Sequence, residues 1–304
     1  MSYRCKQFLL GALFALAPLA HGADARDAVL VSPAWLAEHV HERDLVLLHV
    51  GTPDDFAAEH IAGARQLTMR DIAAPESGGK SLSLELGTPE QLREQLAALG
   101  VGDTSQVVVY FGKDWVSPST RVMLTLDAAG LGARAHLLDG GLPAWKGSGQ
   151  AVTAAATPAR RGTLSKFDIK PVTVDAAFVQ AHKGTPGYAL IDARSPVFYD
   201  GVETGGMIGS RHKTGHITGA GSLPFNTVTD ADLKLKSPEQ LSAMFAAAGA
   251  KPGDTIIAYC HIGQQATAVV FAARSLGYKA VLYDGSFEDW SRRDLPVETT
   301  TAKR

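Results

Sequence analysis

One cysteine of the sequence lies where a thiol could react, between a short apolar run and a helix-forming segment. Cys260 follows residues 256–259 and precedes a small polar loop around Gly263, after which residues 267–276 form a helical stretch that stops at Gly277. We therefore expect the thiol to face the first unpaired backbone N–H groups of a helix, which favour negative charge. Such a position favours a nucleophilic thiolate, whereas the alternative is a small buried hydrophobic side chain.

Residues 1–23 have the pattern of a secretory signal peptide. Basic side chains precede an apolar run at residues 8–19, and small residues follow up to Ala23. The apolar run is short for a membrane span, which makes an uncleaved anchor the weaker alternative. We therefore expect cleavage near Gly22 or Ala23 and a periplasmic or secreted protein. Cys5 would leave with the signal peptide. Cys260 would then be a free thiol in an oxidising compartment, which points to chemistry rather than to a disulfide.

Composition and charge narrow the remaining classes of function. The chain has 304 residues, of which 45% are hydrophobic and 20% charged, and this suits two globular domains of ordinary size. The net charge is −2, and no basic stretch interleaved with aromatic residues indicates a nucleic-acid-binding surface. We expect no nucleic-acid partner, no membrane association after signal cleavage, no cofactor, and a monomer.

Two segments begin helices in the same way. Thr88 and Ser237 are each followed by Pro-Glu-Gln-Leu, which predicts an N-cap, a proline in the first turn and a capping box. The two starts are 149 residues apart, and both helices are expected to end at a glycine, Gly100 and Gly249. Further pairs match at other offsets: Tyr110 with Tyr259, Trp145 with Trp290, and His60 with His216. The varying offsets indicate a duplicated domain with insertions and deletions rather than a solenoid.

Each copy alternates short apolar strands with amphipathic helices. In the second copy the expected strands are residues 190–192, 222–224, 256–259 and 281–283. This alternation predicts parallel pairing, with helices on both faces of one sheet. We expect domains at residues 26–150 and 172–304, joined by a linker at residues 151–171 that is rich in Ala, Thr, Pro and Arg. Ligands of such sheets bind beyond the carboxyl ends of the strands, which is where Cys260 stands.

Four pieces of the second copy stand in order and at consistent spacing: Asp192-Ala193-Arg194, Gly215-His216-Ile217-Thr218-Gly219-Ala220, the Cys260 loop, and Tyr283-Asp284-Gly285-Ser286 with Trp290. Together they resemble the rhodanese family, specifically its two-domain sulfurtransferases of the exported bacterial type, and the resemblance covers about residues 29–297. It implies an α/β fold of tandem rhodanese-like domains, each a mainly parallel five-stranded sheet flanked by helices on both faces.

The first copy departs from the catalytic pattern of the family. Phe111 stands where the second copy has Cys260, and His49-Val50-Gly51 replaces Asp192-Ala193-Arg194. The loop at residues 112–120 is expected to be about four residues longer than its counterpart. The resemblance therefore implies an inactive first domain that walls one side of the cleft and supports a catalytic second domain.

For the second domain the resemblance implies a ping-pong sulfur transfer through a persulfide on Cys260. A small anionic donor, thiosulfate in the leading interpretation, gives its outer sulfur to the thiolate, and an acceptor such as cyanide, a thiol or a protein removes it. The alternatives are 3-mercaptopyruvate as the donor, or a sulfur carrier or binding module of the cell envelope that does not turn over. A cysteine phosphatase is disfavoured, because those enzymes need an arginine six positions after the cysteine, where Ala266 stands.

The expected substrate-binding groups surround the cysteine. Backbone N–H groups of residues 261–266 would stabilise a negative terminal sulfur, and Gly263 lets the loop turn sharply. His261 either lies on the substrate side or is an exposed loop residue, and its neutral ring at pH 7 is a weak anion ligand. Gln264 and Gln265 either donate amide N–H groups to an oxyanion or are ordinary first-turn helix residues.

Two arginines are candidates for binding the donor anion. Arg194 can hold a sulfonate or carboxylate in a fork, but the favoured alternative is an ion pair with Asp192 or Glu203. The position four residues after Arg194, where related long rhodaneses place a substrate-binding arginine, is Phe198. Arg211, in a basic stretch absent from the first copy, is therefore expected to face the cleft, with a solvated loop as the alternative.

No metal site is expected. Four side chains of the types that zinc binds occur in the second copy: His212, His216, Cys260 and His261. Gly215, however, breaks the helix that an i, i+4 pair of ligands needs, and no second cysteine remains in the mature chain. His216 also recurs as His60 in the inactive copy, which favours a structural role for both.

Overall fold

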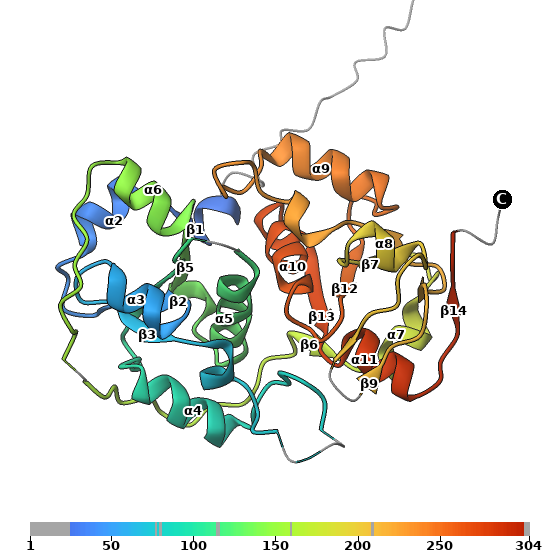
Figure 1. The fold of residues 1–304 in the computed structure, drawn as a ribbon, viewed down its shortest axis with the longest axis horizontal. Helices are drawn as coiled ribbons and strands as arrows, with labels where there is room; N and C mark the ends of the chain where they lie inside the picture. Colours follow the sequence, from blue (N-terminus) through green and yellow to red (C-terminus); the bar gives the residue numbers. More distant parts are fainter. Residues whose placement is uncertain are drawn as a thin grey trace, which may run out of the picture.

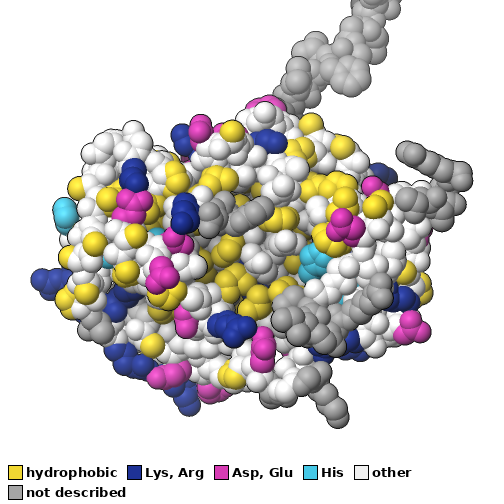
Figure 2. Space-filling model, viewed as in Figure 1, with side chains coloured by type: hydrophobic (Ala, Val, Ile, Leu, Met, Phe, Trp, Pro, Cys, Tyr) yellow, Lys and Arg dark blue, Asp and Glu magenta, His cyan; other side chains and the backbone are white. Residues whose placement is uncertain are grey.

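The structure is a computed structural model that describes residues 25–300, apart from residues 77, 79, 80, 114, 115, 159, 208 and 209 and the side chains of residues 207, 210 and 211. The expected signal peptide, residues 1–23, lies outside the described residues. Two α/β lobes lie side by side (Figure 1), each built on one sheet. On the face shown in Figure 2, hydrophobic side chains gather in the hollow between the lobes. None of the helices described is long and apolar enough for a membrane span.

The first sheet pairs five strands in parallel, in the order β1-β5-β4-β2-β3. In chain order they are β1 (Leu30–Val31), β2 (Leu45–Val50), β3 (Arg65–Leu67), β4 (Gln106–Phe111) and β5 (Ala135–Leu138). The helices of this lobe are α2 (Pro33–His39), α3 (Pro53–Ala58), η1 (Met69–Ile72), α4 (Pro89–Ala98), α5 (Val116–Ala128), η2 (Gly132–Arg134) and α6 (Gly141–Gly147). Leu36 of α2 and Trp145 of α6 pack in one core, and Leu96 of α4 and Leu124 of α5 pack in another, so both faces of the sheet are covered.

The second lobe repeats this architecture, with five parallel strands in the order β11-β7-β12-β13-β6. In chain order they are β6 (Thr173–Val174), β7 (Tyr188–Asp192), β11 (Gly221–Ser222), β12 (Thr255–Tyr259) and β13 (Lys279–Tyr283). The helices are α7 (Ala176–His182), α8 (Pro196–Tyr199), η3 (Phe225–Thr227), α9 (Pro238–Ala247), α10 (Ala266–Ser275) and α11 (Ser286–Arg292). Two short antiparallel pairs complete it: β8 (Gly206–Met207) with β9 (Ser210–Arg211), and β10 (His216–Ile217) with β14 (Val297–Glu298). The predicted tandem fold is confirmed.

The predicted helix starts are confirmed by their capping geometry. The hydroxyls of Thr88 and Ser237 accept from the backbone N–H three residues later, and the glutamine there accepts from the N–H of the cap, which is a complete capping box. Beyond the other ends of α4 and α9, Gly100 and Gly249 have φ values of 86° and 88°. Glycine adopts this left-handed conformation without the penalty that a Cβ imposes, so both helices end there.

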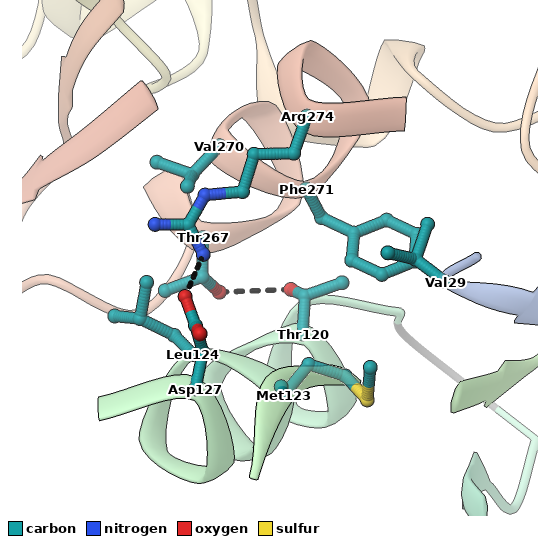
Figure 3. Close-up of a pocket in the computed structure, with 10 residues that line it drawn as sticks. Val29, Thr120, Met123, Leu124, Asp127, Thr267, Val270, Phe271 and Arg274 are labelled. Atoms are coloured by element: carbon teal, nitrogen blue, oxygen red, sulfur yellow. Dashed lines mark hydrogen bonds and ion pairs between the residues drawn. The ribbon is translucent and has the colours of Figure 1, made fainter. Parts of the chain in front are cut away.

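Helices α5 and α10 form the interface between the lobes, and equivalent residues of the two helices meet across it (Figure 3). Three polar pairs lie there: Thr120 with Thr267, Ser117 with Gln264, and Asp127 with Arg274, each at 2.8 Å. The members of every pair are 147 residues apart in the sequence. The duplicated lobes therefore face each other about a local two-fold axis that runs between α5 and α10.

The segment after β4 differs from the expectation for the first copy. Helix α5 begins at Val116, so most of the expected loop at residues 112–120 belongs to the first turn of a helix. Ten positions separate Tyr110 from Thr120, and eight separate Tyr259 from Thr267. The predicted excess of about four residues is therefore wrong, and the first copy is longer by two here.

The segment expected to link the domains lies against the first lobe. Thr153 bridges to His60 in antiparallel fashion, and the carbonyl of Thr163 accepts from the N–H of Asp103 at 3.0 Å. The carboxylate of Asp103 accepts bonds from the backbone and the hydroxyl of Ser165, and Leu164 is buried. These contacts fix the start of the second lobe relative to the first.

Candidate active site

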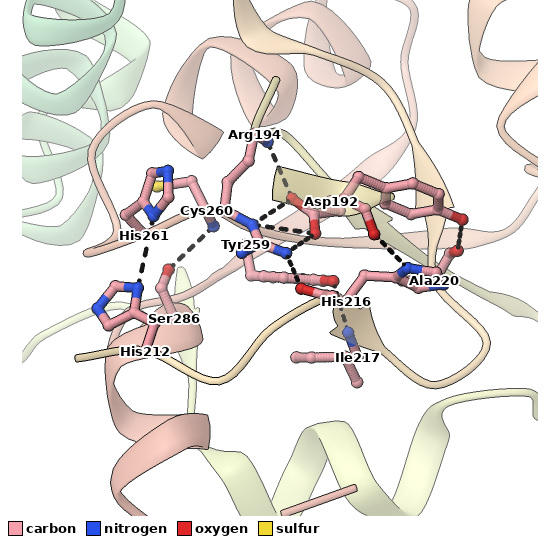
Figure 4. A network of polar contacts seen from close by, with 12 residues as sticks. Asp192, Arg194, His212, His216, Ile217, Ala220, Tyr259, Cys260, His261 and Ser286 are labelled. Atoms are coloured by element: carbon pink, nitrogen blue, oxygen red, sulfur yellow. Dashed lines mark hydrogen bonds and ion pairs between the residues drawn. The ribbon is translucent and has the colours of Figure 1, made fainter. Parts of the chain in front are cut away.

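Cys260 lies directly after β12, at the carboxyl edge of the second sheet, where the sequence placed it. It is fully buried, and its backbone N–H donates to Ser286 Oγ at 3.2 Å (Figure 4). Its carbonyl accepts from the N–H of Phe287 at 3.0 Å. The cysteine is therefore fixed against the start of α11 by two backbone contacts.

Ser286 was not identified from the sequence as a site residue. Its hydroxyl donates to the Tyr283 carbonyl at 2.8 Å while accepting from Cys260, and its φ is 51°, in the left-handed region that disfavours a side chain. The equivalent residue of the first lobe is Gly141, with φ 56°, where an added Cβ would lie 2.6 Å from the ring of Phe111. A serine in this conformation is thus retained only in the lobe that has the cysteine.

The loop after Cys260 presents a row of backbone donors. Within the described part of the chain, none of the N–H groups of residues 261–266 donates to a protein acceptor, and α10 begins at Ala266. Gly263 turns the loop with φ 78°, and an added Cβ would lie 2.4 Å from the backbone oxygen of Asp284. Unpaired N–H groups around a turn and a helix N-terminus favour an anion, as the sequence predicted for this loop.

A pocket of about 240 Å³ opens onto the cysteine. It is lined by Phe198, Gly205, Gly206, Cys260, His261, Ile262, Gln264 and Gln265. The structure therefore brings three predicted substrate-binding side chains, His261, Gln264 and Gln265, to one cavity with the thiol. Phe198 stands on the wall of this pocket.

His261 is a neutral member of this site. Burial lowers the pKa of its ring to about 4, and the charge of Arg194 and the neighbouring His212 act in the same direction. The ring packs edge-on against Phe198, with centroids 4.7 Å apart, and its Nδ1 lies 3.5 Å from Nδ1 of His212. At pH 7 it can offer one N–H donor but no positive charge.

Arg194 is buried behind the cysteine in an ion pair. Its Nη2 donates to Asp192 at 2.6 Å and to the Gly215 carbonyl at 2.7 Å, and its guanidinium lies 3.9 Å from the ring centroid of Phe287. Burial alone would lower the pKa of Arg194, but the adjacent carboxylate of Asp192 outweighs it and raises the pKa. Arg194 thus forms the ion pair with Asp192 that the sequence favoured. Direct binding of the donor by Arg194 stays a prediction.

The two glutamines and Arg211 differ in what surrounds them. Gln264 Nε2 donates to Ser117 Oγ of the first lobe at 2.8 Å, whereas Gln265 Oε1 is buried and has no partner among the described residues. The backbone of Arg211 pairs with Gly206 in the β8–β9 hairpin next to the pocket. Its side chain lies outside the described part of the chain, so its predicted role is untested.

His216 and His60 occupy matching positions in the two lobes. The His216 ring stacks on Tyr199 at 3.7 Å with Nδ1 against the Tyr199 carbonyl, and the His60 ring stacks on Phe56 at 3.8 Å with Nδ1 against the Phe56 carbonyl. The same contacts recur where no cysteine is present, which supports the structural role inferred for both histidines.

The first lobe keeps the framework of the site without its cysteine and its carboxylate. His49 pairs with Tyr110 in the sheet as Asp192 pairs with Tyr259, and Phe111 follows at the position of Cys260. Burial lowers the pKa of His49 to about 4, and neither ring nitrogen has a partner among the described residues. A neutral imidazole and a phenyl ring thus replace the carboxylate and the thiol.

Comparisons with known proteins agree with this duplication. A family model described as "Rhodanese-like domain" matches residues 32–148 and again residues 175–293. A protein of Pseudomonas aeruginosa named "Probable 3-mercaptopyruvate sulfurtransferase" is 33% identical over 275 residues, which cover 86% of this chain and 95% of that protein. The "Thiosulfate/3-mercaptopyruvate sulfurtransferase 1, mitochondrial" of Arabidopsis thaliana is 29% identical over 302 residues, or 89% of this chain and 78% of that protein.

A solved structure shares the fold across both lobes. The anaerobic ergothioneine biosynthesis enzyme of Chlorobium limicola, crystallised with trimethyl histidine, superimposes with a TM-score of 0.79 at 20% identity. The match covers 90% of this chain and 71% of that one. At this identity the likeness concerns the fold alone.

Proposed function

This chain belongs to the rhodanese family and is a sulfurtransferase, and from that premise we propose that Cys260 carries the transferred sulfur as a persulfide. The observation that supports this assignment best is the row of unpaired N–H groups at residues 261–266 beside a buried thiol. Cys260 is also the one free cysteine among the described residues. The first lobe, with Phe111 at the same position, would then serve as its non-catalytic partner.

The proposed first half-reaction forms the persulfide. The Cys260 thiolate attacks the outer sulfur of thiosulfate, the sulfur–sulfur bond of the donor breaks, and sulfite leaves with the electron pair. The product carries its negative charge on the terminal sulfur. The loop N–H groups stabilise that charge without reorganising.

The second half-reaction returns the thiolate. Cyanide or the thiolate form of an acceptor attacks the terminal sulfur, and Cys260 leaves as the anion that the loop already favours. Thiocyanate or a new persulfide is the product. Because the same backbone donors face both anionic states of the cysteine, one loop serves both steps.

Thiosulfate is our proposed donor and 3-mercaptopyruvate the alternative, since relatives of this chain carry the names of both activities. A third possibility is a carrier that accepts sulfur without turning over. Initial rates with each donor and with cyanide as the acceptor separate these cases. Faster turnover of 3-mercaptopyruvate would reverse the choice of donor, and uptake of one sulfur without turnover would identify a carrier.

The assignment of Cys260 is tested by replacing it. Cys260→Ser is expected to abolish thiocyanate formation, and the intact mass of the wild type, but not of the variant, should rise by one sulfur atom after donor treatment and return with a reductant. Cys260→Ser with the wild-type rate would overturn the assignment.

We also propose that residues 1–23 are a cleaved signal peptide and that the protein acts in the periplasm or is secreted. The support is the order of basic, apolar and small residues in this segment. N-terminal sequencing of protein from a periplasmic extract is expected to begin close to Ala23. Full-length protein confined to the cytoplasm would contradict the proposal.

A further inference from the structure

Arg121 of the first lobe reaches into the catalytic loop of the second. It lies in α5, and its side chain is only 3% exposed. One guanidinium nitrogen, Nη1, donates to the Gly263 carbonyl at 3.0 Å and to Asp284 Oδ1 at 2.5 Å. The other, Nη2, donates to the Leu84 carbonyl at 2.5 Å. A single buried side chain thus joins the middle of the Cys260 loop to the turn after β13 and to the first lobe.

The partners of Arg121 are themselves held in place. Asp284 Oδ2 accepts from the N–H of Leu86 at 2.9 Å, and the Gly263 backbone approaches Asp284 so closely that it leaves no room for a Cβ. The Ser83 N–H donates to the buried Glu288 at 3.0 Å. The segment around Leu84 therefore crosses from the first lobe to the second, and Arg121 binds its carbonyl group at Leu84.

The contact with the Gly263 carbonyl also orients the next peptide N–H. In a planar trans peptide the C=O and the following N–H point in opposite directions. Holding the Gly263 carbonyl against α5 therefore turns the Gln264 N–H away from α5. That N–H belongs to the unpaired row that faces no protein acceptor in the described structure.

The arginine breaks the local symmetry of the interface. Three other side-chain pairs at this interface join residues 147 positions apart, which are equivalent in the two lobes. By the same offset the counterpart of Arg121 is Ala268, which cannot reach back to the loop after Phe111. Among the described residues, only the loop that contains the cysteine is held by a buried arginine of the other lobe, which argues against a general role of Arg121 in holding the lobes together.

We propose that Arg121 is a positioning residue for sulfur transfer: it fixes the Cys260 loop through the Gly263 carbonyl so that the loop N–H groups are preorganised for the anionic sulfur. The inference rests on the proposed role of Cys260. It makes the first lobe part of the active site, because the second lobe alone has no group that replaces this guanidinium among its described residues.

The test compares Arg121→Lys with Arg274→Lys. Lysine at position 121 keeps a positive charge near Asp284 but cannot donate in three directions at fixed angles. Arg274→Lys changes the ion pair between α10 and Asp127 of α5, which does not touch the loop. The readouts are the saturating rate of persulfide formation in a single turnover with thiosulfate, the pH profile of Cys260 alkylation, and urea unfolding.

Arg121→Lys is expected to slow persulfide formation by about tenfold or more and to shift the alkylation profile to higher pH, as expected when anion-stabilising donors lose their fixed geometry. Arg274→Lys should keep the wild-type rate and profile even where its unfolding midpoint falls. Wild-type behaviour of Arg121→Lys, or equal losses in both variants, would overturn the proposal.

Should Arg121→Lys not fold, the neutral pair Arg121→Gln with Asp284→Asn is measured in the same way and judged by the same outcomes. Cys260→Ser separately tests the proposed function, since its retention of activity would contradict that assignment whatever Arg121 does.

Discussion

The hydroxyls of Thr120 and Thr267 lie 2.8 Å apart, each on the equivalent helix of a duplicated lobe. Both side chains are buried, and both oxygens also contact the Ser117 carbonyl, at 3.0 and 3.1 Å. Thr267 lies one residue into α10, directly after the Cys260 loop. The helix that presents its N-terminus to the cysteine is therefore also the helix that holds the lobes together.

This contact is expected to couple the two threonines energetically. Thr120→Val and Thr267→Val each leave a buried hydroxyl with one partner fewer, so the double variant should lose less stability than the sum of the single losses, by about 1 kcal/mol. Urea unfolding of the four proteins in the cycle measures the coupling. Thr125→Val paired with Thr267→Val is the control, because Thr125 bonds within α5 to the Arg121 carbonyl. Additivity of the Thr120 pair to within about 0.3 kcal/mol would contradict the prediction.

At Ser286, replacement by glycine is expected to destabilise the protein less than replacement by alanine. Ser286→Ala removes the acceptor for the Cys260 N–H and keeps the left-handed backbone, whereas Ser286→Gly removes the same acceptor and relieves the backbone. The glycine variant should therefore be the more stable of the two by about 1 kcal/mol. Both should transfer sulfur more slowly than the wild type, since the cysteine backbone loses its anchor. Equal unfolding midpoints for the two variants would show that the position is not strained.

The fold and the position of Cys260 could be predicted from the sequence because local patterns carry them. The Pro-Glu-Gln-Leu starts at Thr88 and Ser237 specify capped helices without reference to the rest of the chain. Cys260 was located by the strand before it and the helix after it. The two-residue strand β6 (Thr173–Val174) was missed, because two residues show no periodicity.

The groups around Cys260 depend on contacts that no local pattern contains. Arg121 and Ser117 act on the loop from 142 and 147 residues away, through the packing of two helices. For Arg194, donor binding and pairing with Asp192 require the same fork geometry, so the sequence could not separate them. The duplication held one usable signal, since glycine in the first copy and serine in the second mark the position that contacts Cys260.

Gly263 is expected to tolerate no side chain. Its φ of 78° strains any other residue, and an added Cβ would lie 2.4 Å from the Asp284 carbonyl oxygen, which belongs to the backbone and cannot swing aside. Gly277, at the end of α10, has a φ of 83° but open space around the same position, so Gly277→Ala reports the cost of the backbone conformation alone, about 1 kcal/mol. Gly263→Ala should be less stable than Gly277→Ala in urea and should lose sulfur transfer, while Gly277→Ala keeps it. Equal effects of the two substitutions would mean that the loop moves freely away from Asp284.

His49 is expected to make folding depend on pH in the first lobe. Its folded pKa is about 4, below the ordinary value of 6.5, because burial between Phe56 and Tyr110 disfavours the charged ring. Above pH 6.5 both states are neutral and the contribution is constant. As the pH falls further the unfolded chain takes up a proton that the folded chain refuses, and stability falls by at most about 1.4 kcal/mol per pH unit until the folded pKa is reached. His49→Gln removes this titration, so the slope of unfolding free energy between pH 6.5 and 5 should be shallower than in the wild type. The same slope in both proteins would show that the folded state accepts the proton at His49 as readily as the unfolded chain does.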